Sequence, residues 1–212
     1  MSANSHDLRI VRSADVAAQP WKNGGGVTRE LLRVGADGPD DWTLRISVAD
    51  IAADGPFSPF EGITRWFAVL DGPGVRLRWP GRALHLHPGD APLRFDGADA
   101  PDCTLLGGAT RDLNVMVRRD LADVLVTAAP PLAAAEPGIS PGFGFFALRA
   151  ATLHGAGEAP IALPAWSLAW CEPPFACAQA WRIEPSQDAG GAEEHTSPGY
   201  WIRLLPPAPT AP

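Results

Sequence analysis

The chain has 212 residues, of which 46% are hydrophobic and 19% charged. This apolar content is typical of a packed globular protein. The net charge of −7 argues against a sequence-independent nucleic-acid binder, which needs clustered basic residues to neutralise phosphates. Gly and Pro together occupy 45 positions (22 and 23), far above ordinary usage of about 12%, so helical bundles are excluded and short strands joined by turns are expected.

The N-terminal residues Met1–Pro20 contain no basic start followed by an apolar run, so no signal peptide is expected. The most apolar stretch, Leu121–Ala135, is interrupted by charge and proline and is too short for a membrane span. Three cysteines (Cys103, Cys171 and Cys177) form no CxxC pair and leave one thiol unpaired in any disulfide scheme. Reduced thiols and a cytoplasmic protein without a membrane segment are therefore predicted.

The segment Trp21–Glu30, WKNGGGVTRE, places basic and amide side chains around three consecutive glycines. Lys22 is the only lysine in a chain with 16 arginines, and Asn23 is one of three asparagines. An ammonium and a guanidinium differ in shape and hydration, so a lone lysine in an arginine-rich chain indicates a functional position. The glycines favour either a loop that cradles an anion or a bulge or tight strand connection. Neither a phosphate-loop motif nor GxGxxG is present.

Period-2 alternation predicts strands at Trp42–Val48, Val75–Trp79, Leu84–His87 and Leu113–Arg118, separated by turns rich in Gly, Pro and Asp. The first strand has an apolar face and a polar face of Thr43, Arg45 and Ser47. If the sheet closes into a barrel, this polar face either meets solvent or lines the interior. An interior Arg45 would need an acid such as Glu30 or a bound carboxylate, and Arg65 is open to the same two interpretations.

His85 and His87 alternate on one strand, but two imidazoles without a third ligand do not make a metal site, so no metal is predicted.

The second half of the chain continues the strand pattern. The Pro-, Ala- and Gly-rich segment Thr127–Gly142 is expected to connect two halves. Further strands are predicted at Phe143–Arg149, Ile161–Leu163, Trp166–Cys171, Ala178–Glu184 and Tyr200–Leu205. Composition predicts a loop at Asp188–Glu194 and a disordered tail at Pro206–Pro212.

Several blocks between Pro20 and Arg119 match the pattern of a known family. They are Pro20–Gly26 with Thr28–Glu30, Arg45–Ala49, Asp54–Phe60, Gly62, Arg65, Phe95–Gly97 and Asp112–Arg119. In this order they resemble the HutD/Ves family, and beyond Arg119 the similarity is thin.

The resemblance implies an all-β, cupin-like (RmlC-like) fold with two β-barrel halves in one chain, a bicupin. We expect the first half over residues 8–126, the second over 127–205 and the tail over 206–212. The cupin metal pattern, HxH with a spaced Glu and a later His, is missing here, so no metal or other cofactor is expected. The matched residues expected to bind a ligand are Trp21, Lys22, Asn23, Thr28, Arg29, Arg45, Ser47, Arg65 and Asn114.

For some members, the resemblance also implies a link to bacterial histidine utilisation, moderated by binding a breakdown product such as N-formylglutamate. Other members are associated with stress responses. The leading prediction is a binding protein for a small carboxylated, amide-bearing metabolite. In it Lys22 and Arg45 or Arg65 pair with carboxylates, while Asn23 and Asn114 contact an amide or formyl group.

Two other classes of function stay open, although no catalytic residue is predicted. The first is a metal-independent enzyme acting on a small carboxylated metabolite, with Lys22 or a histidine as general base. The second is an interaction module that uses exposed tryptophans, for which the candidates are Trp166, Trp170, Trp181 and Trp201. The oligomeric state is open as well, with a homodimer among the options.

Overall fold

The computed structural model describes residues 8–35, 41–129, 138–139, 142–155, 159–171, 176–177, 181–186 and 197–207. These residues form β-strands and a single 3-10 turn, Ser13–Asp15, without an α-helix. No helix in this part of the chain has the length and apolar character needed to cross a membrane. The chain divides into two compact units, one built from residues 16–123 and the other from the N-terminal residues up to 15 together with residues 124–206.

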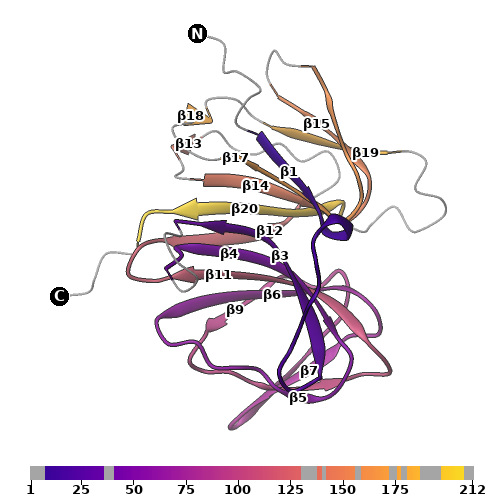
Figure 1. Cartoon of the computed structure of the whole chain (residues 1–212), viewed down its shortest axis with the longest axis vertical. Coiled ribbons are helices and arrows are strands. Elements are labelled where there is room, and N and C mark those ends of the chain that lie inside the picture. The colour runs from indigo at the N-terminus through magenta and orange to yellow at the C-terminus, as the bar shows by residue number, and fades with distance from the viewer. Residues whose placement is uncertain are drawn as a thin grey trace. The chain divides into compact units, whose positions relative to one another are not determined.

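The unit of residues 16–123 consists of two antiparallel sheets (Figure 1). The six-stranded sheet has the order β2-β3-β4-β11-β6-β9, and the four-stranded sheet has the order β5-β10-β7-β8. The strands are β2 Gln19–Pro20, β3 Gly26–Val34, β4 Leu44–Ile51, β5 Gly55–Pro56, β6 Ile63–Asp71, β7 Val75–Trp79, β8 Arg82–Leu86, β9 Leu93–Asp96, β10 Asp102–Leu105 and β11 Thr110–Arg118.

Apolar side chains from both sheets form the core of this unit. Phe67 and Val69 of β6 pack in one cluster with Val75 and Leu77 of β7, and all four are at most 2% exposed. Alternation along each strand turns one face toward this cluster. The regularity of β7, whose residues alternate between buried and exposed, is what made Val75–Trp79 recognisable in the sequence.

The other unit is also built from antiparallel sheets around its own core. Its sheets have the strand orders β1-β17-β14-β20-β12, β16-β15-β19 and β13-β18. Phe145 and Trp201 of the first sheet pack in one cluster with Leu153 and Ile183 of the second. The strands are β1 Leu8–Arg12, β12 Asp123–Ala128, β13 Gly138–Ile139, β14 Gly142–Ala147, β15 Ala151–His154, β16 Ile161–Leu163, β17 Ser167–Cys171, β18 Ala176–Cys177, β19 Arg182–Pro185 and β20 Gly199–Leu205.

The four tryptophans considered for an interaction surface do not form an exposed patch. Trp170 and Trp201 are buried, at 1% and 8% exposure, and Trp166 and Trp181 are half-buried. Trp181 packs edge-on against Phe143, with ring centroids 5.1 Å apart. Most of this aromatic surface therefore serves packing within the unit, as is usual for large aromatic side chains.

The N-terminal strand lies in a different unit from the one its sequence position suggests. The expected first half begins at residue 8, yet β1 pairs with β17, Leu8 opposite Cys171, and so belongs with the residues that follow 123. The expected loop at 188–194 and most of the expected tail, residues 208–212, lie outside the described residues.

Candidate functional site

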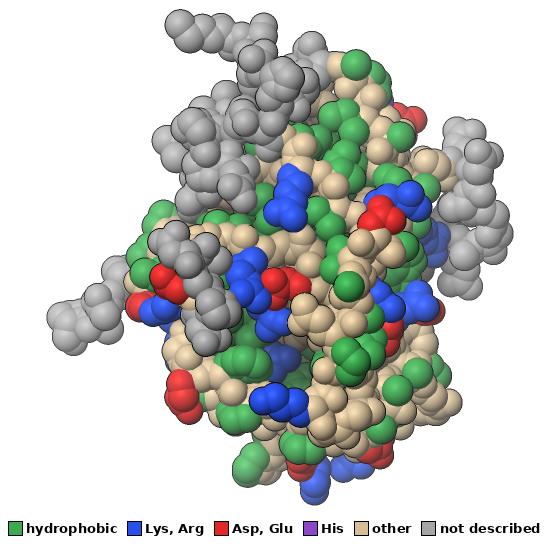
Figure 2. Space-filling model, viewed as in Figure 1, with side chains coloured by type: hydrophobic (Ala, Val, Ile, Leu, Met, Phe, Trp, Pro, Cys, Tyr) green, Lys and Arg blue, Asp and Glu red, His purple; other side chains and the backbone are tan. Residues whose placement is uncertain are grey.

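A cavity of about 410 Å³ opens within the unit of residues 16–123. Figure 2 shows a hollow on this face, with basic side chains in and around it. Of the described residues that line the cavity, none is acidic. The lining consists of Gln19, Pro20, Trp21, Lys22, Asn23 and Thr28, of Arg45, Ser47, Ala49 and Ile51 on β4, of Pro56, Phe57, Ser58 and Phe60, and of Arg65, Asn114 and Met116.

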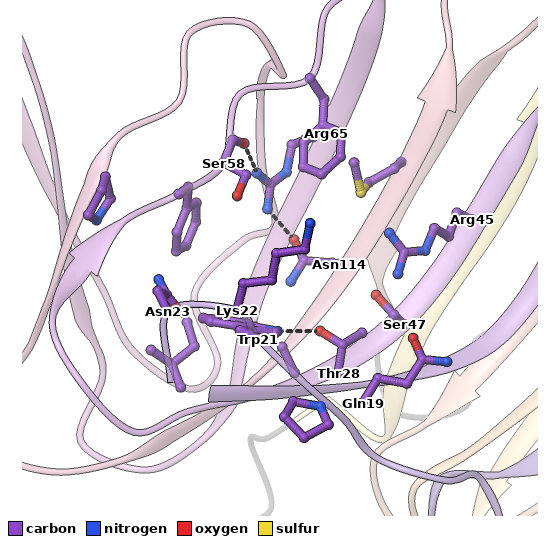
Figure 3. Close-up of a pocket in the computed structure, with 17 residues that line it drawn as sticks. Gln19, Trp21, Lys22, Asn23, Thr28, Arg45, Ser47, Ser58, Arg65 and Asn114 are labelled. Atoms are coloured by element: carbon purple, nitrogen blue, oxygen red, sulfur yellow. Dashed lines mark hydrogen bonds between the residues drawn. The ribbon is translucent and has the colours of Figure 1, made fainter. Parts of the chain in front are cut away.

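The structure brings together eight of the nine residues expected to bind a ligand, as Figure 3 shows. The ninth, Arg29, does not line the cavity. Its neighbour Thr28 does, and successive side chains of a strand point to opposite faces. Arg29 instead pairs with Asp50 at 2.5 Å, and Asp50 also accepts a bond from Arg111 at 3.1 Å.

Sheet register places the polar face of β4 beside two other strands. β11 lies between β4 and β6, and Met116 is directly opposite both Arg45 and Arg65. The three side chains therefore stand in one row on the same face, and all three line the cavity. Of the Thr43-Arg45-Ser47 face, Arg45 and Ser47 line the cavity and Thr43 does not.

Arg65 is a buried cation without a carboxylate partner among the described residues. It is 7% exposed, and its guanidinium lies over the rings of Phe57, Phe60 and Phe95 at 5.0, 5.6 and 5.2 Å. Nη2 donates to Asn114 Oδ1 at 2.8 Å, while the buried Nε has no hydrogen-bond partner. Burial lowers the pKa of Arg65 to about 10, and the charge of Arg45 acts in the same direction. The group remains charged at neutral pH, at a cost of roughly 3 kcal/mol.

Arg45 has the acidic partner that its interior position requires. Its Nε donates to Glu30 Oε2 at 2.6 Å, and Glu30 also accepts two bonds from Arg33, at 2.9 and 2.8 Å. Burial raises the pKa of Glu30, but the hydrogen bonds and charges of Arg33 and Arg45 outweigh it and hold that pKa below its usual value. Of the two partners left open for Arg45, an acid such as Glu30 or a bound carboxylate, the structure shows Glu30.

Lys22 enters the cavity from the loop before β3. Its side chain points inward toward Arg65 and Asn114 in Figure 3. It is exposed and makes no ion pair among the described residues. Beside it, Trp21 forms part of the wall, held by a bond from its Nε1 to Thr28 Oγ1 at 2.7 Å. Lys22 and Arg65 are therefore the two lining cations that lack an acidic partner in this part of the structure.

The two asparagines present hydrogen-bond donors to the cavity. Asn114 Oδ1 accepts from Arg65, and Asn23 Oδ1 accepts from the Gly25 amide at 3.0 Å. With both oxygens engaged, the NH₂ group of each side chain is left to donate. Ligands rich in acceptor oxygens fit this lining best.

The glycines form a tight connection between β2 and β3, one of the two interpretations left open. The Trp21 amide donates to Gly26 O at 2.9 Å, and the Gly24 amide donates to Trp21 O at 3.0 Å. Gly24 has φ 71°, a left-handed conformation that favours glycine. A Cβ at Gly26 would lie 2.3 Å from the carbonyl oxygen of Asp50 and 3.1 Å from the Trp21 ring. Gly26 therefore lets the loop close against β4.

Gly26→Ala is expected to lower stability by about 2–3 kcal/mol, because the added methyl forces β3 away from β4. For a chain of this length that corresponds to a fall in melting temperature of roughly 5–10 °C. Gly25→Ala is the matched control, since its nearest contact is 3.4 Å to the Asn23 side chain, and it stays within about 0.5 kcal/mol. Equal melting temperatures for the two variants in differential scanning calorimetry would contradict this role of Gly26.

A carboxyl group is buried next to the strands that line the cavity. Asp112 is 0% exposed and lies opposite Ala49, a lining residue of β4. Thr110 Oγ1 donates to its Oδ2 at 3.0 Å, and its buried Oδ1 has no hydrogen-bond partner. Burial raises the pKa of Asp112 to about 8 despite the opposing bond from Thr110, and the charge of Asp50 raises it further. Asp112 is therefore mostly protonated at neutral pH.

Sequence reasoning missed the apolar side of the cavity. Alternation from Arg45 and Ser47 places Ala49 and Ile51 on the same face, so their positions were available from the strand pattern. Met116 follows from Asn114 by the same rule. The remaining missed residues, Gln19, Pro20, Pro56, Phe57, Ser58 and Phe60, lie in turns or short strands, where no periodicity points to a face.

Sequence comparison relates the chain to bacterial proteins. A family model described as HutD matches residues 13–188. An uncharacterized 21.2 kDa protein in the hutC 3′ region of Pseudomonas putida is 44% identical over 110 residues, 51% of this chain. Protein Ves of Citrobacter koseri is 36% identical over 110 residues, also 51% of this chain. The matched region spans little more than half of each of these relatives, 57% of its length.

Structural comparison relates the fold to solved structures. HutD from Pseudomonas fluorescens SBW25 superimposes with a TM-score of 0.77 and 23% identity, covering 95% of this chain and all of that one. A cupin 2 conserved barrel domain protein from Leptotrichia buccalis superimposes with a TM-score of 0.54 and 9% identity, covering 93% of this chain and 96% of that one. At these identities the likeness concerns the fold, which is all-β and cupin-like.

Proposed function

Since this chain belongs to the HutD family, we propose that it is a binding protein for a small carboxylated metabolite, N-formylglutamate or a related breakdown product, and that it thereby moderates histidine utilisation. The observation that carries the proposal is Arg65, a buried cation in the cavity wall without a carboxylate partner in the described structure. The name of the Pseudomonas putida relative, which refers to the hutC region, supports the link to that pathway. The proposal takes the two units as the two barrels of a bicupin.

A ligand carboxylate would supply what Arg65 lacks. An unpaired buried charge is costly, and an oxygen anion accepting from it forms a charge-assisted bond worth about 1.5–3 kcal/mol. Arg65 lines the cavity, and the centroids of three aromatic rings lie 5.0, 5.6 and 5.2 Å from its guanidinium carbon. Lys22 enters the same cavity and is the partner for a second carboxylate.

The amide donors fit the rest of such a ligand. The NH₂ groups of Asn114 and Asn23 donate to a formyl or amide oxygen, and the apolar side of the cavity, with Ile51 and Met116, contacts a short methylene chain. Among the described lining residues, a free ammonium group finds no acid to pair with. An N-acylated amino acid is therefore favoured over the same amino acid with a free amine.

Saturation with N-formylglutamate is expected to raise the melting temperature. At one hundred times the dissociation constant, a ligand that binds only the folded protein stabilises it by about 2.7 kcal/mol, or roughly 5–10 °C here. Glutamate, which carries a free ammonium, is the matched control and gives a smaller shift at equal concentration. A thermal-shift screen that also includes urocanate and histidine makes the measurement.

The same samples separate binding from turnover. Time-resolved NMR of N-formylglutamate with the protein is expected to show broadening of ligand signals and no new species. Flat melting curves with every carboxylated metabolite would contradict the proposal, and a product signal that disappears in Lys22→Ala would replace it with catalysis.

A further inference from the structure

Glu30 lies just outside the cavity but acts on a residue of its wall. It does not line the cavity, whereas Arg45 does. The 2.6 Å bond from Arg45 Nε to Glu30 Oε2 joins two side chains that are 21% and 19% exposed. A pair this far removed from solvent is screened less than a surface pair, so the carboxylate changes the charge that a ligand meets at Arg45.

The shape of β3 keeps Glu30 at this position. Thr28 and Glu30 are two residues apart and share a face, and Glu30 lies opposite Ser47 in the ladder with β4. A register shift then falls between Glu30 and Leu32, which allows Leu31 and Leu32 both to be buried at 1% exposure. The bulge thus holds the carboxylate beside β4 while the strand continues into the core.

The three cations that line the cavity consequently differ in whether they have an acidic partner. Arg45 has an acidic partner, whereas Lys22 and Arg65 have none among the described residues. Arg33 also bonds to Glu30 but does not line the cavity. The lining therefore offers two positive charges without an acidic partner and a third, Arg45, whose acidic partner is shared with Arg33.

Resting on the proposed carboxylate-binding function, we propose that Glu30 determines the charge of the preferred ligand, by offsetting Arg45 so that the cavity selects dianions over trianions. Loss of the Glu30 charge leaves Arg45 uncompensated and adds one positive charge to the wall. A third carboxylate on the ligand then gains a partner. Glu30 touches no ligand in this account and acts as a specificity-determining residue through Arg45.

The test compares two ligands that differ by one carboxylate, N-formylglutamate and N-formyl-γ-carboxyglutamate. Isothermal titration calorimetry near neutral pH gives the ratio of their affinities. In Glu30→Gln this ratio is expected to shift about tenfold toward the trianion, a size between the effects of one added charge at roughly 5 Å in bulk water and near a protein surface. The affinity for the dianion changes less than the affinity for the trianion. Any general effect of the substitution on the site alters both affinities and cancels in their ratio.

Three further variants distinguish charge selection from a structural effect. Glu61→Gln makes the same change in net charge at an exposed acid that forms no ion pair in the described structure, and it leaves the ratio unchanged. Glu30→Gln/Arg45→Gln restores the wild-type preference. Arg45→Gln alone leaves Glu30 without its lining partner and shifts the ratio toward the dianion, which keeps the test decisive if Glu30→Gln does not fold.

The outcomes separate this inference from the proposed function. Wild-type protein that binds neither ligand overturns both. Wild-type protein that binds N-formylglutamate, with the same affinity ratio in Glu30→Gln and Arg45→Gln, overturns the role of Glu30 and leaves the binding function standing. An equal shift in Glu61→Gln also overturns it, because net charge alone would then explain the preference.

Discussion

Arg65→Met is expected to weaken binding of N-formylglutamate by about 100-fold or more, while the melting temperature of the ligand-free protein changes by less than about 4 °C. Truncating one partner of a buried charged contact costs about 2–5 kcal/mol, which accounts for the loss of affinity. Methionine fills the space between Phe57, Phe60 and Phe95 without bringing a charge into it.

The small effect on stability follows from opposing contributions. Removing the buried guanidinium relieves roughly 3 kcal/mol of desolvation. It also removes the bond to Asn114 and the aromatic contacts, together worth about 2–4 kcal/mol. The net change in the free energy of unfolding is therefore near zero, as expected for a residue whose charge serves binding rather than folding.

Calorimetric titration and melting curves of the same variant measure both quantities. Arg76→Met is the matched control, since Arg76 is exposed on β7 outside the cavity, and it leaves affinity unchanged. Arg65→Lys also loses most of the affinity, because an ammonium does not reproduce the planar donor group between the rings. Full affinity in Arg65→Met, or a melting temperature lower by more than about 10 °C, would assign Arg65 to structure instead.

Asp112→Asn is expected to make the protein more stable than wild type at alkaline pH and equally stable below about pH 4. The neutral amide resembles the protonated acid in size and still accepts the bond from Thr110. It does not ionise, so it avoids the cost that wild-type Asp112 meets as the pH rises. Guanidinium unfolding at several pH values measures the difference.

The direction of this pH dependence follows from the proton that Asp112 holds in the folded state and releases in the unfolded state. The pKa of Asp112 is raised from 3.8 to about 8 in the folded protein. Between these values the folded state holds a proton that the unfolded state has released, so stability falls as pH rises, by about 1.4 kcal/mol per pH unit. Its contribution is fully present below about pH 4 and is lost as the pH passes about 8. Between pH 5 and 8 the wild type loses roughly 3–4 kcal/mol from this group.

An exposed aspartate provides the control for this pH series. Asp102→Asn removes a carboxyl whose side chain is 54% exposed and pairs with Arg78, and its unfolding curves run parallel to those of the wild type above pH 5. If Asp112→Asn and wild type lose stability in parallel between pH 5 and 8, Asp112 ionises normally and its burial has no energetic consequence.

Regular alternation located two strands to the residue, whereas β3 and β6, which lack it, were not located from the sequence. Val75–Trp79 and Ile161–Leu163 match β7 and β16 to the residue. β6 carries the continuous run Trp66–Leu70, which is half-buried or buried throughout, so alternation gave no signal. In β3 the register shift puts Leu31 and Leu32 both in the interior, which breaks the period of 2.

Part of the cavity lining could be picked out from the sequence, because unusual residues mark it. A lone lysine, a rare asparagine and three glycines drew attention to Trp21–Gly26, and the structure places that loop at the cavity. Arg29 was included although its neighbour Thr28 and strand alternation together exclude it. The burial of Arg65 among three rings depends on residues from different strands and turns, and it required the three-dimensional structure.

The single lysine of the chain also makes the cavity a chemical reporter. Lys22 is the only side-chain amine available to an acylating reagent, and it is exposed at the entrance of the cavity. A fluorescent or isotopic tag attached through that amine marks this entrance in every molecule, with the α-amino group as the other amine that can react. Protection of Lys22 from acylation therefore gives an occupancy assay that needs no catalytic readout.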